Sequence, residues 1–193
     1  EFGYNGPRFS FVPVPDQFAL WVGDRRIGEL TADGGEAEER PLLVYNQLVS
    51  SHPPFNKIPP VVDDWSHLGD GTIYRRRSEE IRRFDNSWTG GTQLDEGYVA
   101  SLTYVFDVLA TYFTDHMNHD RPSLIIVFGD HQPPRPVRAA DAPRSVPIHI
   151  ASRSSLLVDR LRAEGFQPGM RNDTPPPHRD MSDFFPLFAE LAG

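Results

Sequence analysis

The spacing of apolar residues changes along the chain in a way that predicts helices alternating with strands. From residue 95 to about residue 116 the apolar positions recur at helical spacing and predict an amphipathic helix of several turns; they include Val99, Leu102, Val105, Phe106, Leu109 and Phe113. The run Leu124–Phe128 favours a strand, because it is uninterrupted, apolar and too short for a typical helix. Gly129 ends this run. We expect a central strand that is buried on both faces.

Weaker patterns predict further elements on both sides of this strand. Residues 42–49 form a short apolar run before a proline-containing loop at 50–55, so we expect a buried strand there. Residues 19–27 predict a helix, and Asp16 is placed to cap its first free N–H groups. The other predicted elements are one helix near residues 78–84 within an irregular stretch at 56–93, a strand at 146–151, a helix at 154–164 ending at Gly165, and a last helix at 181–191 capped by Asp180.

This alternation is typical of an α/β fold with a largely parallel central sheet flanked by helices. A continuous apolar strand fits such a sheet, because helices cover both of its faces. The chain has 193 residues, and a single core is the usual solution up to roughly 250 residues. Its 13 Phe and 3 Trp supply large side chains for that core. We therefore expect residues 1–193 to form a single domain.

Composition excludes several classes of function. The formal net charge of −8 opposes binding to nucleic acid, and the basic run at residues 75–77 with Arg82 and Arg83 is interleaved with acidic residues, as on a solvated helix face. The absence of cysteine excludes disulfides and thiolate chemistry. No apolar stretch approaches the ~20 residues that a membrane helix needs. The start at residues 3–6, Gly-Tyr-Asn-Gly, looks like entry in the middle of a protein, so we expect a fragment.

Three side chains with metal-binding or anion-binding chemistry follow the predicted strands. Asp130 and His131 come directly after the strand at Leu124–Phe128, and His52 follows the strand at 42–49. Ligands of open α/β sheets collect beyond the carboxyl ends of the parallel strands. An adjacent carboxylate and imidazole suit Zn, Mn or Mg. A turn or capping role is the alternative for the pair, and capping of the following loop is the alternative for His52.

Residues 125–131, Ile-Ile-Val-Phe-Gly-Asp-His, resemble the strand-to-loop motif of the alkaline phosphatase and sulfatase superfamily, in which the Asp and His bind metal. Residues 50–55, Ser-Ser-His-Pro-Pro-Phe, are similar to the family's Ser-His-x-Pro-Phe/Tyr segment, whose His contacts the phosphate or sulfate group. Weaker resemblances lie at 98–113, at 146–150, at 178–193, and at Pro-Asp-Gln-Phe 15–18, which recurs in membrane-anchored members. Together they cover roughly residues 11–193.

The resemblance implies that the chain is the C-terminal part of a sulfatase-like or phosphoglycerol-transferase-like domain. Asp130 and His131 would bind a divalent metal, namely Zn, Mn or Mg, with Ca as a further choice, and His52 would bind the substrate. The implied protein hydrolyses or transfers a phosphate or sulfuric ester of a glycan, an envelope polymer or a lipid-linked substrate, without nucleic acid. Membrane segments outside this chain would hold it on the extracytoplasmic side.

Two departures from the family pattern leave a second hypothesis open. The family's nucleophile and acidic metal ligand lie upstream of the matched region, so we expect no catalytic residue in this chain and no activity of the chain alone. Gln132, Pro133 and Pro134 follow the Gly-Asp-His motif where the family has a small residue. The alternative is a non-catalytic relative that serves as a binding or scaffolding domain of a membrane protein. In either case Trp65, Tyr74 and Trp88 bind a sugar or glycerol phosphate, or only pack the long loop.

Overall fold

The fold is that of a computed structural model, which describes residues 3–9, 11, 13–36, 40–88, 90–118, 120–135, 137–170 and 178–192. The chain divides into two compact units. Unit 1 comprises Glu1–Met117 and Pro133–Ala139, and unit 2 comprises Asn118–Gln132 and Ala140–Gly193. The expectation that residues 1–193 form a single domain stays a prediction.

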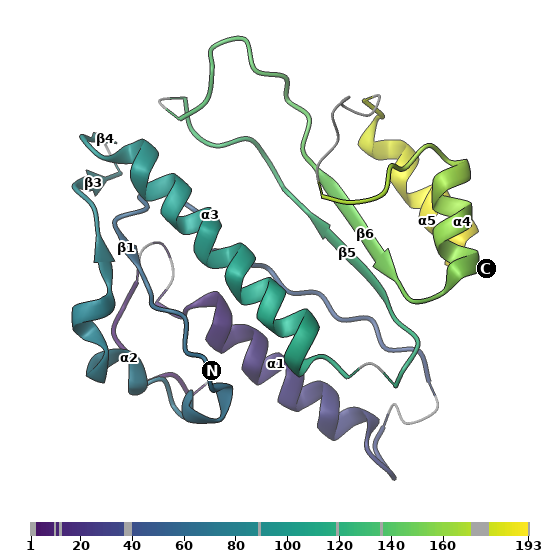
Figure 1. The fold of residues 1–193 in the computed structure, drawn as a ribbon, viewed down its shortest axis with the longest axis horizontal. Coiled ribbons are helices and arrows are strands. Elements are labelled where there is room, and N and C mark those ends of the chain that lie inside the picture. The colour runs from purple at the N-terminus through teal and green to yellow at the C-terminus, as the bar shows by residue number, and fades with distance from the viewer. Residues whose placement is uncertain are drawn as a thin grey trace. The chain divides into compact units, whose positions relative to one another are not determined.

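Unit 1 is built on two packed helices, α1 (Asp16–Thr31) and α3 (Leu94–Thr111), which lie side by side in Figure 1. The chain continues from α3 into a π-helical turn at Tyr112–His116. The helix expected over residues 95–116 is therefore confirmed. The helix expected at 19–27 is also confirmed, and it is longer at both ends.

Short elements complete unit 1. Strand β1 (Lys57–Ile58) pairs antiparallel with β2 (Arg82–Arg83), and β3 (Asn86–Ser87) pairs antiparallel with β4 (Gly90–Gly91). Between β1 and β2 lie the short helix α2 (Ile73–Arg76) and two 3-10 turns, Trp65–His67 and Ser78–Glu80. The helix expected near residues 78–84 is wrong, because only that second turn is helical and the chain then enters β2.

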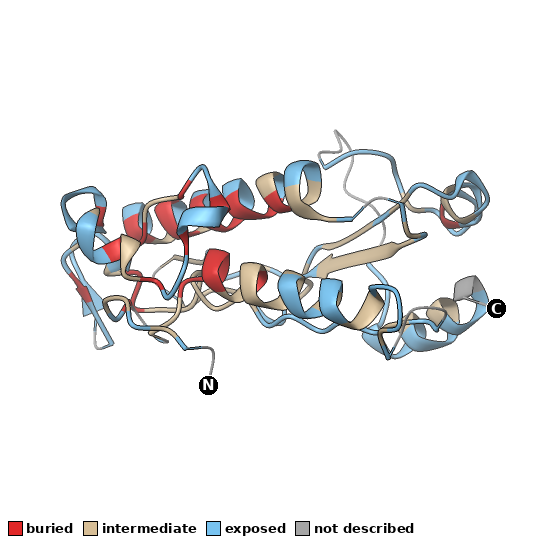
Figure 2. Cartoon of the chain, turned by 90° about the horizontal axis from the view of Figure 1, so that it is seen from below, coloured by how far each residue is buried: buried red, intermediate tan, exposed pale blue. Residues whose placement is uncertain are grey.

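The core of unit 1 contains a hydrogen-bonded polar side chain among aromatic rings. Gln17 is fully buried; its Nε2 donates to the Val62 carbonyl at 2.8 Å, and its Oε1 accepts from Val62 N at 2.9 Å and from the Tyr74 hydroxyl at 3.2 Å. The Tyr104 hydroxyl accepts from Gln17 N at 3.3 Å. Figure 2 shows the buried residues gathered along α3 and the first turns of α1. Buried polar groups are tolerated when they are paired in this way.

Unit 2 is a two-stranded antiparallel sheet with two helices. Strand β5 (Leu124–Phe128) pairs with β6 (Ile148–Ser152), and the register places Leu124 opposite Ser152. Helix α4 (Ser155–Ala163) contacts β6 and α5 (Phe184–Ala192). These elements confirm the predicted strand at 146–151 and the predicted helices at 154–164 and 181–191.

Of the two predicted helix ends, Gly165 behaves as expected and Asp180 does not. Ser154 caps α4, because its Oγ accepts from Leu157 N at 3.4 Å, and Gly165 takes the left-handed φ of +87° beyond the C-terminal end. A 3-10 turn at Met181–Asp183 precedes α5. Asp180 makes no side-chain capping bond to that turn, so this expectation is wrong.

The expected fold class, α/β with a largely parallel central sheet, is wrong. In the described residues every sheet has two strands and every pairing is antiparallel. Parallel neighbours need a crossover connection, which is usually a helix. The described part of the connection between β5 and β6 forms no helix, and residues 129–147 contain prolines at 133, 134, 136, 143 and 147. β6 therefore returns beside β5 in the opposite direction.

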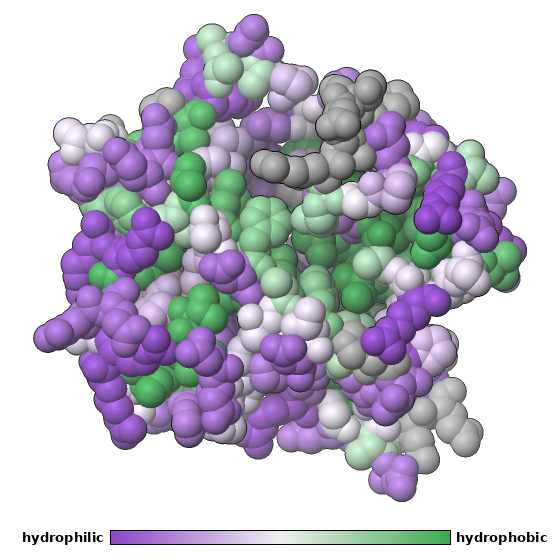
Figure 3. Space-filling model, in the orientation of Figure 1, coloured by the Kyte–Doolittle hydropathy of each residue, from purple (hydrophilic) through white to green (hydrophobic). Residues whose placement is uncertain are grey.

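The two apolar runs expected to be buried strands are more exposed than predicted. The side chains of β5 are partly covered, and Phe128 is 48% exposed. Figure 3 shows hydrophobic side chains at the surface over β5 and β6. Residues 42–49 form no ladder with another described segment, and Leu43 is 90% exposed. A buried strand requires partners on its edges and layers on its faces, which the described chain does not supply here.

No helix among the described residues has both the length and the apolar character to cross a lipid bilayer.

Candidate functional site

Asp130 and His131 lie on a turn directly after β5. Gly129 N donates to the Pro147 carbonyl at 3.2 Å and extends the β5–β6 ladder by one bond, after which the chain turns outward. Asp130 Oδ1 accepts from His131 N at 2.9 Å, and Asp130 Oδ2 lies 3.5 Å from His131 Nε2. Both side chains are mostly exposed, at 75% for Asp130 and 61% for His131. The turn thus presents an oxygen and a nitrogen side by side.

The imidazole of His131 is oriented by a backbone carbonyl. Its Nδ1 lies 2.9 Å from the Gln132 carbonyl oxygen, so the tautomer that donates there carries its lone pair on Nε2. Metal-binding histidines are commonly held in this way by the second ring nitrogen. The nitrogen that faces Asp130 is therefore the one that can bind a cation.

These donors fit one side of a divalent metal site. A carboxylate oxygen and an imidazole nitrogen suit Zn or Mn, but protein metal sites use at least three or four ligands. Among the described residues, no group of three or more His, Asp or Glu side chains is arranged to hold a metal ion. The pair can therefore act as part of a metal site whose other ligands come from elsewhere.

Unit 1 contains a second Asp and His pair at a similar distance, so a short distance between the two side chains does not by itself indicate a metal site. His67 Nε2 lies 3.7 Å from Asp64 Oδ2, and both side chains are exposed. The Asp64 carboxylate caps a turn, because Oδ1 accepts from Ser66 N at 2.9 Å and from Ser66 Oγ at 2.6 Å. These hydrogen bonds lower the pKa of Asp64. The pair of Asp130 and His131 differs in its position at a strand end and in the oriented imidazole.

His52 lies in unit 1, in a turn that its own backbone closes. His52 N donates to the Val49 carbonyl at 3.0 Å, and His52 Nδ1 lies 2.9 Å from the Pro53 carbonyl oxygen. The ring stacks on Phe11 with centroids 4.0 Å apart and meets Trp88 edge to face at 5.9 Å. Its Nε2 has no hydrogen-bond partner among the described residues. The ring is held while this nitrogen remains open to a ligand.

Asp16 fixes the start of this turn from a distance in sequence. Its Oδ1 accepts from Val49 N at 2.8 Å, its Oδ2 accepts from Ser50 N at 3.1 Å, and Asp16 N donates to Ser50 Oγ at 3.4 Å. The side chain is 1% exposed, and this burial raises its pKa above the usual value. The expected capping role is wrong: Asp16 clamps the segment that leads to His52.

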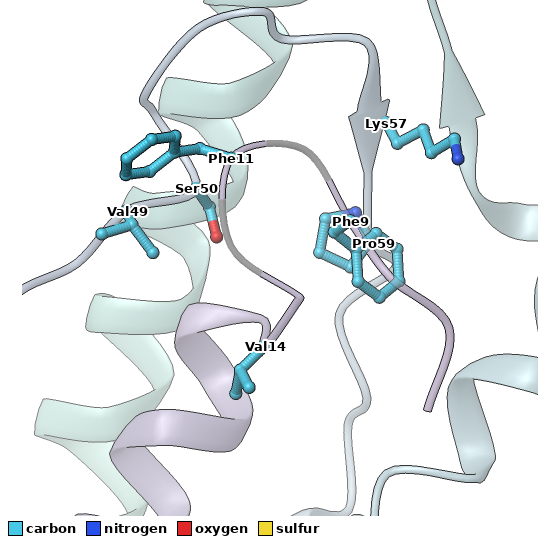
Figure 4. Close-up of a pocket in the computed structure, with 7 residues that line it drawn as sticks. All are labelled: Phe9, Phe11, Val14, Val49, Ser50, Lys57 and Pro59. Atoms are coloured by element: carbon cyan, nitrogen blue, oxygen red, sulfur yellow. The ribbon is translucent and has the colours of Figure 1, made fainter. Parts of the chain in front are cut away.

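A small, shallow hollow lies next to this turn (Figure 4). Phe11, Val49 and Ser50 line one side of it, and Lys57 and Pro59 line another. Phe11 is shared between the hollow and the ring stack on His52. Sequence reasoning missed Lys57 and the clamp by Asp16, because both depend on contacts between segments far apart in the chain.

The aromatic residues of the long loop divide into two groups. Trp65 is 2% exposed and Tyr74 is 0% exposed, so both pack the core of unit 1. Trp88 is 64% exposed and lies against His52. Of these three side chains, Trp88 is therefore the one that a ligand can contact.

The structure brings together Asp130 and His131, both in unit 2, whereas His52 belongs to unit 1. A cleft shared by the three side chains stays a prediction. Comparison of the chain with protein-family models, with curated proteins and with solved structures finds no match. The resemblance to the sulfatase superfamily therefore rests on the motifs in the sequence.

Proposed function

We propose that this chain is part of a metal-dependent hydrolase or transferase that acts on phosphate or sulfuric esters. The observation that carries the proposal is the turn after β5, where an exposed carboxylate and an oriented imidazole lie 3.5 Å apart at their nearest polar atoms. A bound divalent cation supplies Lewis acidity toward an ester oxygen. Asp130 and His131 provide two of its ligands in this proposal.

His52 is the side chain that we assign to the oxyanion of the substrate. Its ring is fixed by Phe11 and by the turn at Val49, and its Nε2 is open. Because Nδ1 donates to the Pro53 carbonyl, Nε2 carries a hydrogen in the imidazolium form, and in that form the ring donates to a phosphoryl or sulfuryl oxygen on which charge develops. The clamp by Asp16 contributes to this positioning.

The rest of the enzyme proposal depends on residues outside this chain. The nucleophile and the remaining metal ligands precede the matched region, and the substrate is a glycan or an envelope polymer on the extracytoplasmic side of a membrane. The chain alone then binds metal weakly and does not turn over substrate.

A non-catalytic binding or scaffolding domain is the second candidate, and two observations favour it. The described residues offer no third ligand for a metal at Asp130 and His131. The turn also leads into Gln132, whose Nε2 donates to the Ser145 carbonyl, and then into two prolines that stiffen the loop.

Titration with Mn²⁺ followed by ¹⁵N-resolved NMR tests the metal ligands, because a paramagnetic ion broadens nearby amides even when binding is weak. We expect broadening to begin at residues 129–132, and we expect Asp130→Ala to abolish it. The matched control is Asp64→Ala, which removes the carboxylate of the second Asp and His pair and leaves that broadening unchanged. Equal broadening at both pairs, or broadening that survives Asp130→Ala, refutes the assignment.

The two candidates separate in a longer form of the protein that includes the upstream residues. The enzyme proposal predicts metal-dependent hydrolysis of p-nitrophenyl phosphate or p-nitrophenyl sulfate, lost in Asp130→Ala. Metal binding at residues 129–132 without turnover of either ester supports the scaffold.

A further inference from the structure

Two cations lie opposite each other in the short ladder of unit 1. Lys57 of β1 pairs with Arg83 of β2, and both side chains are exposed. Directly opposed residues of an antiparallel pair lie on the same face, with Cβ atoms about 4.5–5.5 Å apart, and like charges there are destabilising. The neighbouring bond from Phe84 N to the Asn56 carbonyl at 3.1 Å makes this a non-hydrogen-bonded pair, the kind in which opposed side chains approach most closely.

Neither cation is neutralised by an acid of the described chain, although the sequence has 27 acidic and only 19 basic residues. In the described residues no carboxylate lies within 4.0 Å of Lys57 or Arg83, whereas other arginines do find such partners; these are Arg26 with Glu29, Arg77 with Glu80, Arg162 with Asp159, and Arg179 with Glu164. A local excess of positive charge on an acidic protein attracts an anion to this place.

The position of the cations relates them to His52. Lys57 lines the hollow whose other side contains Phe11, and Phe11 stacks on the His52 ring. In Figure 4 the Lys57 side chain lies across the hollow from Phe11 and Ser50, and its ammonium points away from them. The cation pair is thus separate from the oxyanion site at His52, and a ligand that contacts both must be longer than a single ester group.

We propose that Lys57 and Arg83 bind a second anionic group of the substrate, a phosphate or sulfate placed at a distance from the ester at His52. The substrate class is then a polymer or glycan with several such groups, rather than a single small ester. This inference rests on the proposed function for its second anchor, His52, but not for the cation pair itself.

Arg82 supplies a matched control one residue away. Its guanidinium lies 5.4 Å from the centroid of the Phe84 ring, and it is opposite Ile58, which is 2% exposed, so it lies on the other face of the ladder. Arg82→Gln and Arg83→Gln remove the same charge from adjacent positions. If the effect is general electrostatics, both variants weaken anion binding equally. If Lys57 and Arg83 form a specific site, Arg83→Gln weakens anion binding more than Arg82→Gln does.

The experiment compares orthophosphate, tripolyphosphate and a multiply sulfated disaccharide by calorimetry, with amide shifts as the local readout. We expect tripolyphosphate to bind the wild type about tenfold more tightly than orthophosphate, the gain from one additional charge-assisted contact. Arg83→Gln should reduce this gain and Arg82→Gln, which removes the same charge, should keep it; Lys57→Gln combined with Arg83→Gln should remove the gain. The sulfated disaccharide shows whether sulfate substitutes for phosphate.

Unchanged tripolyphosphate affinity in the double variant, or an equal loss in Arg82→Gln, overturns the inference. Failure of the proposed function looks different. If His52→Ala leaves orthophosphate binding unchanged while tripolyphosphate still shifts the amides of β1 and β2, the role of His52 is wrong and the cation site stands.

Discussion

The two units differ in how completely they bury their apolar side chains. In unit 1, Phe18, Phe55, Leu68 and Val108 are each 0% exposed. In unit 2, Leu161 is the one described hydrophobic side chain that is buried, whereas Phe185 is 74% exposed. The comparison shows that the two candidate site elements have unequal support. The turn that carries His52 is held by the buried Asp16, whereas the turn of Asp130 and His131 follows a strand pair with little apolar cover.

This difference in burial affects how firmly the side chains of each candidate site are held in position. A functional side chain is useful when packing and hydrogen bonds lock its position. His52 has such support from Phe11 and from the clamp by Asp16. Segments with few buried apolar contacts open locally at a lower free energy. We therefore expect the turn after β5 to gain order when a metal and further ligands bind.

The largest effect should come from a matched pair of leucine truncations. Leu68 is 0% exposed in unit 1, and Leu161 is 5% exposed in unit 2. Truncation of a buried leucine costs about 2–5 kcal/mol, depending on how far the surroundings collapse into the cavity. We expect Leu68→Ala near the top of this range and Leu161→Ala near the bottom.

Hydrogen exchange followed by mass spectrometry reads each unit separately. Leu68→Ala should speed exchange in α1 and α3, and Leu161→Ala should speed it in α4 and β6. An effect of Leu161→Ala as large as that of Leu68→Ala would contradict the contrast between the units.

A smaller effect should follow from Asp16→Asn. The oxygen of Asn can still accept from Val49 N and Ser50 N, but its NH2 group replaces the acceptor that lies 3.1 Å from Ser50 N. Two donors then face each other, and a buried donor left unpaired costs about 1–3 kcal/mol. Denaturation with urea measures this loss. The His52 ring signal in NMR should also broaden, because the turn loses its clamp.

The pH dependence of the same variant sharpens this test. Burial raises the folded-state pKa of Asp16 above 3.8, so its contribution to stability is full below that pH and declines as the pH rises through the folded-state pKa. The difference in unfolding free energy between wild type and Asp16→Asn should therefore shrink as the pH rises. Asp64→Asn is the control with the opposite sign, because hydrogen bonds from Ser66 lower the pKa of Asp64. A difference for Asp16 that grows with pH would show that its clamp favours the ionised form.

The smallest effect on stability should come from Asp130→Ala. The side chain is 75% exposed, and substitutions at such positions usually change the unfolding free energy by less than about 0.5 kcal/mol. The same variant is expected to lose the Mn²⁺ broadening at residues 129–132. A loss of stability well above this range would indicate a structural role for the carboxylate.

The helices were more predictable from the sequence than the sheet. Helical spacing predicted α3, but not which side is buried: Val99 is 62% exposed and Phe106 is 46% exposed, whereas Tyr104 and Val108 face the core. The glycine at position 165 correctly predicted where α4 ends, whereas the cap by Ser154 was found only in the structure. Helical spacing and helix-end residues depend on one element alone, so they can be recognised in the sequence without knowing which elements pack against it.

The strand predictions failed because an apolar run shows that a segment can be buried. It does not specify how many strands pair with that segment or whether they are parallel or antiparallel. Leu124–Phe128 forms a strand, as expected, but its single described partner is antiparallel. Residues 42–49 have the same apolar character and pair with no described segment. Asp16 was misassigned for a related reason, since its acceptors serve backbone groups 33 and 34 residues away.

The link between Asp16 and Ser50 joins two points that are 34 residues apart and closes the chain between them into a loop. Residues 43–47 in that loop are exposed, and Tyr45 is 75% exposed. Insertions, deletions or a proteolytic nick at this stretch would leave both ends tied together. Changes in this stretch are therefore expected to leave the imidazole of His52 stacked on Phe11.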